Sequence, residues 1–160
     1  KMRVAGLVLL CLAVSVSATS IPDKFFGKFV IDRSENFDEF LSAKGVGFLT
    51  RQIIKLASVT KVFAKGPTDD TYVYENLSSK KDVKYTFKLG EQFTAEGLDS
   101  TQHEITFDFK DGEVTEHHKR VGNPDFTPET YHYTISEDGK ELVMRMTNNG
   151  ITCHRYLKRQ

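Results

Sequence analysis

The chain has 160 residues and is electrically neutral near pH 7, because 22 Lys and Arg balance 22 Asp and Glu. A neutral chain with evenly spread charges lacks the basic surface typical of nucleic-acid-binding proteins, so we expect no nucleic-acid partner. Twelve Phe and six Tyr predict a globular domain with an aromatic interior and argue against a disordered chain.

The first 18 residues have the pattern of a cleavable signal peptide. Lys1 and Arg3 are basic, residues 4–16 are almost entirely apolar or small, and residues 16–18 are the small Val-Ser-Ala that signal peptidase accepts. The apolar run of about 13 residues is shorter than the roughly 20 needed to span a bilayer, so a permanent anchor is the weaker interpretation. We expect a secreted, extracellular protein that begins near Thr19.

Residues 19–160 are expected to form one domain without a disulfide. About 142 residues are enough for a single hydrophobic core. Cys11 lies in the expected signal peptide, which leaves Cys153 as the only thiol of the mature protein. Stability should therefore come from packing, even in an oxidising compartment.

A strand and two short helices are expected at the start of this domain. The strand covers residues 24–33. Asn36 and Glu39 have capping-box spacing, which predicts a helix over residues 36–43. Residues 48–57 place apolar side chains on one side and basic ones on another, which predicts a second helix.

From Val59 onward the sequence predicts about nine strands. Segments rich in Phe, Tyr, Val, Ile and Thr recur about every ten residues, and residues alternate between apolar and polar in 83–89 and 105–110. The turns between them contain Gly66, Gly90, Gly112, Gly122, Gly139 and Gly150. Closing the antiparallel sheet into a barrel removes its exposed edges and leaves room for a small ligand or water. A β-sandwich is the alternative.

Several segments carry a more specific pattern. They are residues 26–30 (FGKFV), 35–41 (ENFDEFL), 45–51 (GVGFLTR), 89–93 (LGEQF), 138–139 (DG) and 150–156 (GITCHRY). Together they resemble the fatty-acid-binding protein family, also called intracellular lipid-binding proteins, of the calycin superfamily. The resemblance implies an all-β, ten-stranded antiparallel up-and-down barrel with a two-helix lid between the first and second strands. It also implies a monomeric, non-enzymatic carrier of one long-chain fatty acid or related lipid, without a cofactor.

The expected signal peptide narrows this resemblance. The family is normally cytosolic, so the chain resembles the exported fatty-acid-binding proteins of nematodes. Connections 64–70 and 122–129, which are longer than typical family turns, support that branch. This implies extracellular lipid transport or buffering. The alternative is a retinoid carrier or a lipid chaperone that delivers its ligand to a receptor. The sequence offers no convergent acid, base and nucleophile of the kind that an enzyme would need.

The resemblance places the ligand carboxylate at Arg155. Family members commonly use an arginine and a tyrosine two residues apart on the last strand, and a second arginine two strands earlier. Arg155 matches the first, but Leu157 and Ile135 occupy the other two positions. Alternation along the strand turns Arg155 inward with Cys153, and Tyr156 outward. We expect Arg155 to be the principal anchor, because a buried cation requires an anion.

Strand 114–121 can present either of two faces to the interior. Aligned to the family, Glu116, His118 and Arg120 face inward, and Glu116 then neutralises Arg120; the opposite face, which includes His117, stays open as an alternative. Tyr133 and Arg120 are expected to assist Arg155. The complete set of expected ligand-binding residues is Arg155, Tyr133, Arg120, His118, Leu157, Ile135, Met144, Met146, Phe37, Leu41, Val46 and Ile54.

The five histidines do not predict a metal site. Adjacent His117 and His118 point to opposite faces of a strand, and no Cys or carboxylate spacing completes a tetrahedral set. Asp99 and Ser100 near His103 lack the surrounding motifs of a hydrolase, so we expect a solvated turn there.

Basic residues gather around the second helix. Arg51 and Lys55 lie one turn apart, with Lys44 and Lys61 near the helix ends, and we expect them to form a small patch on the lid. Such patches are usually solvated helix faces. The alternative is transient contact with anionic membranes during lipid transfer.

Overall fold

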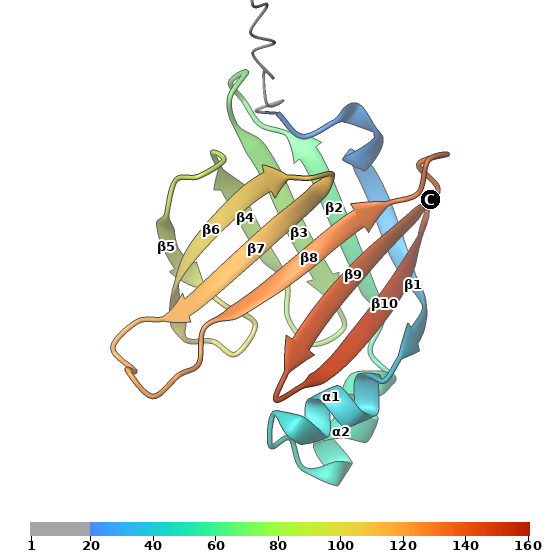
Figure 1. Cartoon of the computed structure of the whole chain (residues 1–160), viewed down its shortest axis with the longest axis vertical. Helices are drawn as coiled ribbons and strands as arrows, with labels where there is room; N and C mark the ends of the chain where they lie inside the picture. The colour runs from blue at the N-terminus through green and yellow to red at the C-terminus, as the bar shows by residue number, and fades with distance from the viewer. Residues whose placement is uncertain (1–19) are drawn as a thin grey trace, which may run out of the picture.

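The computed structural model describes residues 20–160, which form a nearly closed barrel of ten antiparallel strands with two helices between the first and second strands (Figure 1). The strands are β1 Gly27–Glu35, β2 Val59–Lys65, β3 Tyr72–Ser78, β4 Val83–Phe87, β5 Phe93–Glu96, β6 Gln102–Lys110, β7 Glu113–Arg120, β8 Glu129–Ile135, β9 Glu141–Asn148 and β10 Ile151–Arg159. The helices are η1 Asp23–Phe25, a single 3-10 turn, α1 Phe37–Ala43 and α2 Phe48–Lys55. The predicted barrel and lid are confirmed, and the expected signal peptide lies outside the described residues.

The barrel is open along one seam. Strands pair in the order β4-β3-β2-β1-β10-β9-β8-β7-β6-β5, so β1 joins β10 while β4 and β5 do not pair with each other. The expectation that closure removes both sheet edges is therefore wrong at this seam. Side chains bridge it instead: the Tyr85 ring lies 5.6 Å from that of Phe93, and its hydroxyl donates to the Glu96 carbonyl at 2.9 Å.

Two of the predicted turns are tight hairpins with left-handed backbone. Asp111 and Gly112 have φ of 53° and 79°, and Asn149 and Gly150 have φ of 46° and 77°. Two successive positive φ angles define the type I′ turn, which matches the twist of the flanking strands. The Asp-Gly and Asn-Gly sequences therefore fix the β6–β7 and β9–β10 hairpins.

The start of the domain differs from the prediction in two details. The strand expected at residues 24–33 begins later, because η1 turns Phe25 into the interior, where it is fully buried. Asn36 does not cap α1: its φ is 55°, and its side-chain amide donates to the Thr152 carbonyl at 3.2 Å. Asn36 therefore ties the end of β1 to β10. The helix predicted over 48–57 ends at Lys55.

The end of the barrel away from the lid is closed by Arg159. Its guanidinium donates to the carbonyl oxygens of Lys24, Phe26 and Gly139, each at 2.6 Å, and lies 4.6 Å from the ring centre of Phe29. One side chain thus joins η1, the start of β1 and the β8–β9 turn. None of the helices between residues 20 and 160 is long and apolar enough to cross a membrane.

Candidate ligand-binding site

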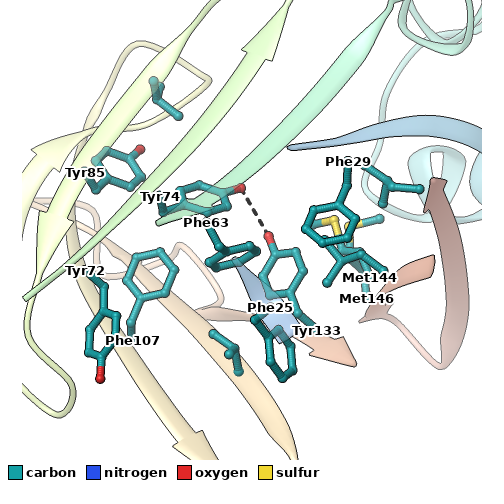
Figure 2. Close-up of a cluster of buried hydrophobic side chains, with 14 of the residues drawn as sticks. Phe25, Phe29, Phe63, Tyr72, Tyr74, Tyr85, Phe107, Tyr133, Met144 and Met146 are labelled. Atoms are coloured by element: carbon teal, nitrogen blue, oxygen red, sulfur yellow. Dashed lines mark hydrogen bonds between the residues drawn. The ribbon is translucent and has the colours of Figure 1, made fainter. Parts of the chain in front are cut away.

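Aromatic side chains fill the middle of the barrel (Figure 2). The ring of Phe63 contacts those of Tyr74 and Tyr133, with ring centres 5.2 and 5.3 Å away. Phe107 stacks on Phe87 at 4.0 Å and lies 5.4 Å from Tyr74. Edge-on and offset contacts of this kind add to the stabilisation from burial. The aromatic composition of the chain is therefore concentrated in the interior, as the sequence predicts.

A chain of hydrogen bonds crosses this apolar interior. Lys61 Nζ donates to the Tyr74 hydroxyl at 2.6 Å, and the Tyr74 and Tyr133 hydroxyls are 3.2 Å apart, as the dashed line in Figure 2 shows. Tyr133 in turn donates to Glu116 Oε2 at 2.6 Å, and Glu116 Oε1 lies 2.7 Å from His118 Nε2. The chain thus links β2, β3, β8 and β7.

The direction of the bonds in this chain follows from its ends. An ammonium group only donates and an ionised carboxylate only accepts, so Tyr133 gives its proton to Glu116 and must accept one from Tyr74. Burial works to raise the pKa of Glu116, but the hydrogen bond from His118 and the charges of His118 and Lys61 outweigh it and hold that pKa below its ordinary value. Burial, and then the charge of Glu116, raises the pKa of Tyr74 and Tyr133 well above 10. Both tyrosines are therefore neutral donors near neutral pH.

The face of β7 that points into the barrel is the one expected from the alignment to the family. Val114, Glu116 and His118 are buried, whereas His117 is exposed. The pairing expected for Glu116 is wrong, however, because Glu116 contacts His118 and Tyr133 instead of Arg120.

Arg120 lies at the end of β7 and has partners of its own. It pairs with Asp99, and its guanidinium lies 4.7 Å from the ring centre of Phe126 in the long β7–β8 connection. Asp99 also accepts from Thr101 at 2.7 Å and lies 3.0 Å from His103 Nε2. Arg120 therefore fastens the β5–β6 turn to the β7–β8 connection, and the structure does not bring it to Arg155.

Arg155 lies beneath the lid. Its guanidinium is 4.2 Å from the ring centre of Phe37 on α1, and its Nε donates to Ser34 Oγ at 3.3 Å. Burial lowers the pKa of Arg155 from its ordinary value. It borders a hollow of 410 Å³ between β1 and the helices, which is partly open and is lined mostly by polar and charged side chains, among them Asp32, Asp38 and Lys55. Within residues 20–160, no carboxylate forms an ion pair with it.

The other expected site residues lie on the lid and on the wall formed by the last strands. Leu41, Met144, Met146, Leu157 and Tyr133 are buried in the core. Phe37, Val46, Ile54 and Ile135 are partly buried and pack against it. Apolar side chains thus continue from α1 and α2 down β9 and β10, as expected for a wall that contacts a hydrocarbon chain.

The basic patch expected on the lid is not formed as predicted. Lys44 pairs with Glu129, and both Arg51 and Lys55 pair with Asp38. Lys61 does not belong to the patch, because it is only 4% exposed and points into the barrel. The exposed surface here is largely apolar: Phe48, Leu49 and Ile53 of α2 and Leu56 just after it are exposed, together with Thr50 and Lys55.

Sequence reasoning missed the polar group around Lys61. Asn76 accepts from Lys61 Nζ at 2.8 Å and is itself buried, as is Tyr74. The sequence did contain a sign that Lys61 is buried. Residues alternate across a strand, so Lys61 shares one face of β2 with the apolar residues Val59 and Phe63.

No model of a protein family matches the sequence. The Caenorhabditis elegans protein named fatty acid-binding protein homolog 3 is 57% identical over 150 residues, or 92% of this chain and 90% of that protein. The fatty acid-binding protein homolog of Ascaris suum is 48% identical over 158 residues, or 96% of this chain and 95% of that protein. The structure of As-p18, an extracellular fatty acid binding protein, matches with a TM-score of 0.82 at 49% identity, covering 87% of this chain and 98% of that chain. The chain therefore belongs to the fatty-acid-binding protein family.

Proposed function

We propose that this protein is a secreted, non-enzymatic carrier that binds one long-chain fatty acid inside the barrel. The observation that carries the proposal is Arg155, a cation on the inner face of β10 without a carboxylate partner among residues 20–160. A ligand carboxylate satisfies such a guanidinium with two parallel hydrogen bonds. Tyr133 contributes to the buried wall of the site, and its hydroxyl proton is donated to Glu116. The relatives named as fatty acid-binding proteins support the same assignment.

The apolar wall supplies the remaining affinity in this proposal. Phe37 and Leu41 from α1, with Met144, Met146 and Leu157, offer contacts to a hydrocarbon chain. Each methylene removed from water contributes about 0.8 kcal/mol, so a long chain gains more from burial than from its head group. Methionine side chains adapt to chains of different shape.

Secretion rests on the sequence of residues 1–18 and on As-p18, which is described as extracellular. The secreted protein should start at or near Thr19, which intact-mass measurement of protein exported from eukaryotic cells tests directly. Cys153 is a free, buried thiol, so it should react with a thiol reagent after unfolding even without a reductant. An exported protein that keeps residues 1–18, or a blocked Cys153, contradicts this part of the proposal.

Native mass spectrometry of the purified protein tests the ligand assignment. We expect one fatty acid per protein, and we expect oleate to displace a bound fluorescent fatty acid. Retinol serves as the competitor for the alternative function: displacement by retinol but not by oleate would identify a retinoid carrier. A protein that retains no lipid and binds neither competitor would contradict the carrier function.

A further inference from the structure

We propose that Lys61 supplies the second positive charge that holds the ligand's carboxylate, in place of the arginine that the family carries at the position of Ile135. The assignment rests on the proposed function and names the ligand class more closely, as a single-chain lipid with an ionised head group. Lys61 lies on β2, a strand that contributes none of the ligand-binding residues expected from the sequence.

Lys61 is a buried cation with only neutral partners. It is 4% exposed, and its ammonium donates to the Tyr74 hydroxyl at 2.6 Å and to Asn76 Oδ1 at 2.8 Å. Lysine is almost never fully buried without a charged partner. An ammonium group has three protons, so one is left for a ligand oxygen. In the part of the chain that the structure describes, no carboxylate lies within ion-pair distance of Lys61.

The charges around Lys61 do not balance. The groups that face it or act on its charge are Tyr74 and Asn76 on β3, Tyr133 on β8, Glu116 with its partner His118 on β7, and Arg155 on β10. Two buried or partly buried cations, Lys61 and Arg155, act on each other across the interior, and the carboxylate nearest to Lys61 is that of Glu116. Glu116 is already occupied by His118 and Tyr133. A ligand carboxylate would give Lys61 and Arg155 an anion of their own, whereas an alcohol, an ester or retinol would not.

The position of Lys61 also compensates for the substitutions on the last strands. Leu157 and Ile135 remove the tyrosine and the second arginine of the usual head-group site. Lys61 restores the charge. The Tyr74 hydroxyl lies 2.6 Å from its ammonium, and the ring centre of Tyr133 lies 5.7 Å from it. The head group would then bind between β2 and β10.

A bound carboxylate should couple binding to the protonation of Lys61. Burial lowers the pKa of Lys61 to about 8, Glu116 opposes this shift and the charge of Arg155 adds to it. A ligand anion favours the charged ammonium, so binding above pH 8 must take up a proton. Between pH 8 and 9.5 the neighbouring groups keep their charge, because the pKa values of Tyr74 and Tyr133 lie well above 10 and that of Glu116 is below its ordinary value.

The pH dependence of wild-type affinity tests the assignment without any mutation. Oleate affinity should fall by up to about tenfold per pH unit above 8, while affinity for oleyl alcohol stays constant, since one pKa unit corresponds to a tenfold change in equilibrium constant. Equal pH dependence for both ligands, or none for oleate, would overturn the role of Lys61. If the wild type binds neither ligand, the proposed function itself fails.

Lys61→Met provides the second test, with Lys84→Met as the matched control. Lys84 lies on β4, exposed and paired with Glu75. At pH 7 we expect Lys61→Met to weaken oleate binding at least about tenfold, because a hydrogen bond to a charged group is lost. The variant should also lose the alkaline pH dependence and bind oleyl alcohol within about threefold of the wild type. The assignment is overturned if Lys61→Met binds oleate as tightly as Lys84→Met does. An equal loss for oleate and alcohol also overturns it, because it indicates a damaged barrel.

Discussion

The two ends of the barrel are held in different ways. At one end Arg159 fixes three backbone carbonyls and covers Phe29, and Phe25 is fully buried beside them. The helices α1 and α2 lie at the other end (Figure 1). No residue of α2 is buried, and Leu49 in α2 and Leu56 just after it are 76% and 87% exposed. Local stability follows buried contacts, so the lid end is the end that opens at least cost. Stability and ligand exchange are thus assigned to opposite ends.

Removing the clamp at the closed end should have the largest effect. Arg159→Met breaks three hydrogen bonds from one charged group and leaves carbonyl oxygens of Lys24, Phe26 and Gly139 without this partner. We expect the free energy of unfolding to fall by about 3 kcal/mol, measured by urea denaturation. Lys158→Met is the control on the same strand, because its ion pair with Asp32 lies at the surface and should contribute little to stability. Similar losses in both variants would refute the clamp.

Arg155→Gln tests the site beneath the lid. Loss of a charged hydrogen bond worth about 1.5–3 kcal/mol should weaken oleate binding about tenfold to a hundredfold. Fatty alcohol and methyl ester binding should change much less, because they depend on burial of the chain. Arg145→Gln is the matched control, since Arg145 lies on β9 and pairs with Glu113 at the surface. Unchanged oleate affinity, or equal losses for acid and alcohol, would remove Arg155 from the site.

The exposed face of α2 should affect exchange more than stability. Ile53→Ser alters a half-exposed side chain, so unfolding should change by no more than about 0.5 kcal/mol, whereas Ile54→Ser, which removes a contact with the core, should cost about 1–2 kcal/mol. If α2 inserts its apolar face into anionic vesicles, Ile53→Ser should also slow transfer of a fluorescent fatty acid to them. Transfer at the wild-type rate would indicate diffusion through water instead of membrane contact.

The fold was predictable because its signals are local. The Asp111-Gly112 and Asn149-Gly150 sequences favour the backbone angles of their turns, and period-two alternation grouped the residues on the buried face of β10. For β7 alternation left both faces open, and the resemblance to the family indicated which one is buried. The open seam between β4 and β5 was not predictable, because closure depends on the curvature of the whole sheet and not on either strand's sequence.

The site was predictable only in part, because its contacts join distant strands. Resemblance placed Arg155, yet the pairing of Arg120 with Asp99 depends on the path of the β5–β6 turn beside β7. Lys61 was assigned to the lid because it follows α2 closely in sequence. However, Lys61 is on the same face of β2 as Val59 and Phe63. A charged residue flanked on its face by two apolar residues indicates a side chain that points into the barrel.

The ionisation state of bound oleate tests the central claim most directly. The oleate is labelled at its carboxyl carbon, and the NMR signal of the bound ligand is followed as the pH is lowered. The signal should remain that of a carboxylate at pH values well below the pKa of the free acid, because Lys61 and Arg155 both stabilise the anion. In the double variant Lys61→Met, Arg155→Gln, the signal should titrate at or above the ordinary pKa of the acid. A wild-type signal that titrates like free acid in water would show that the carboxylate is not held by these two cations.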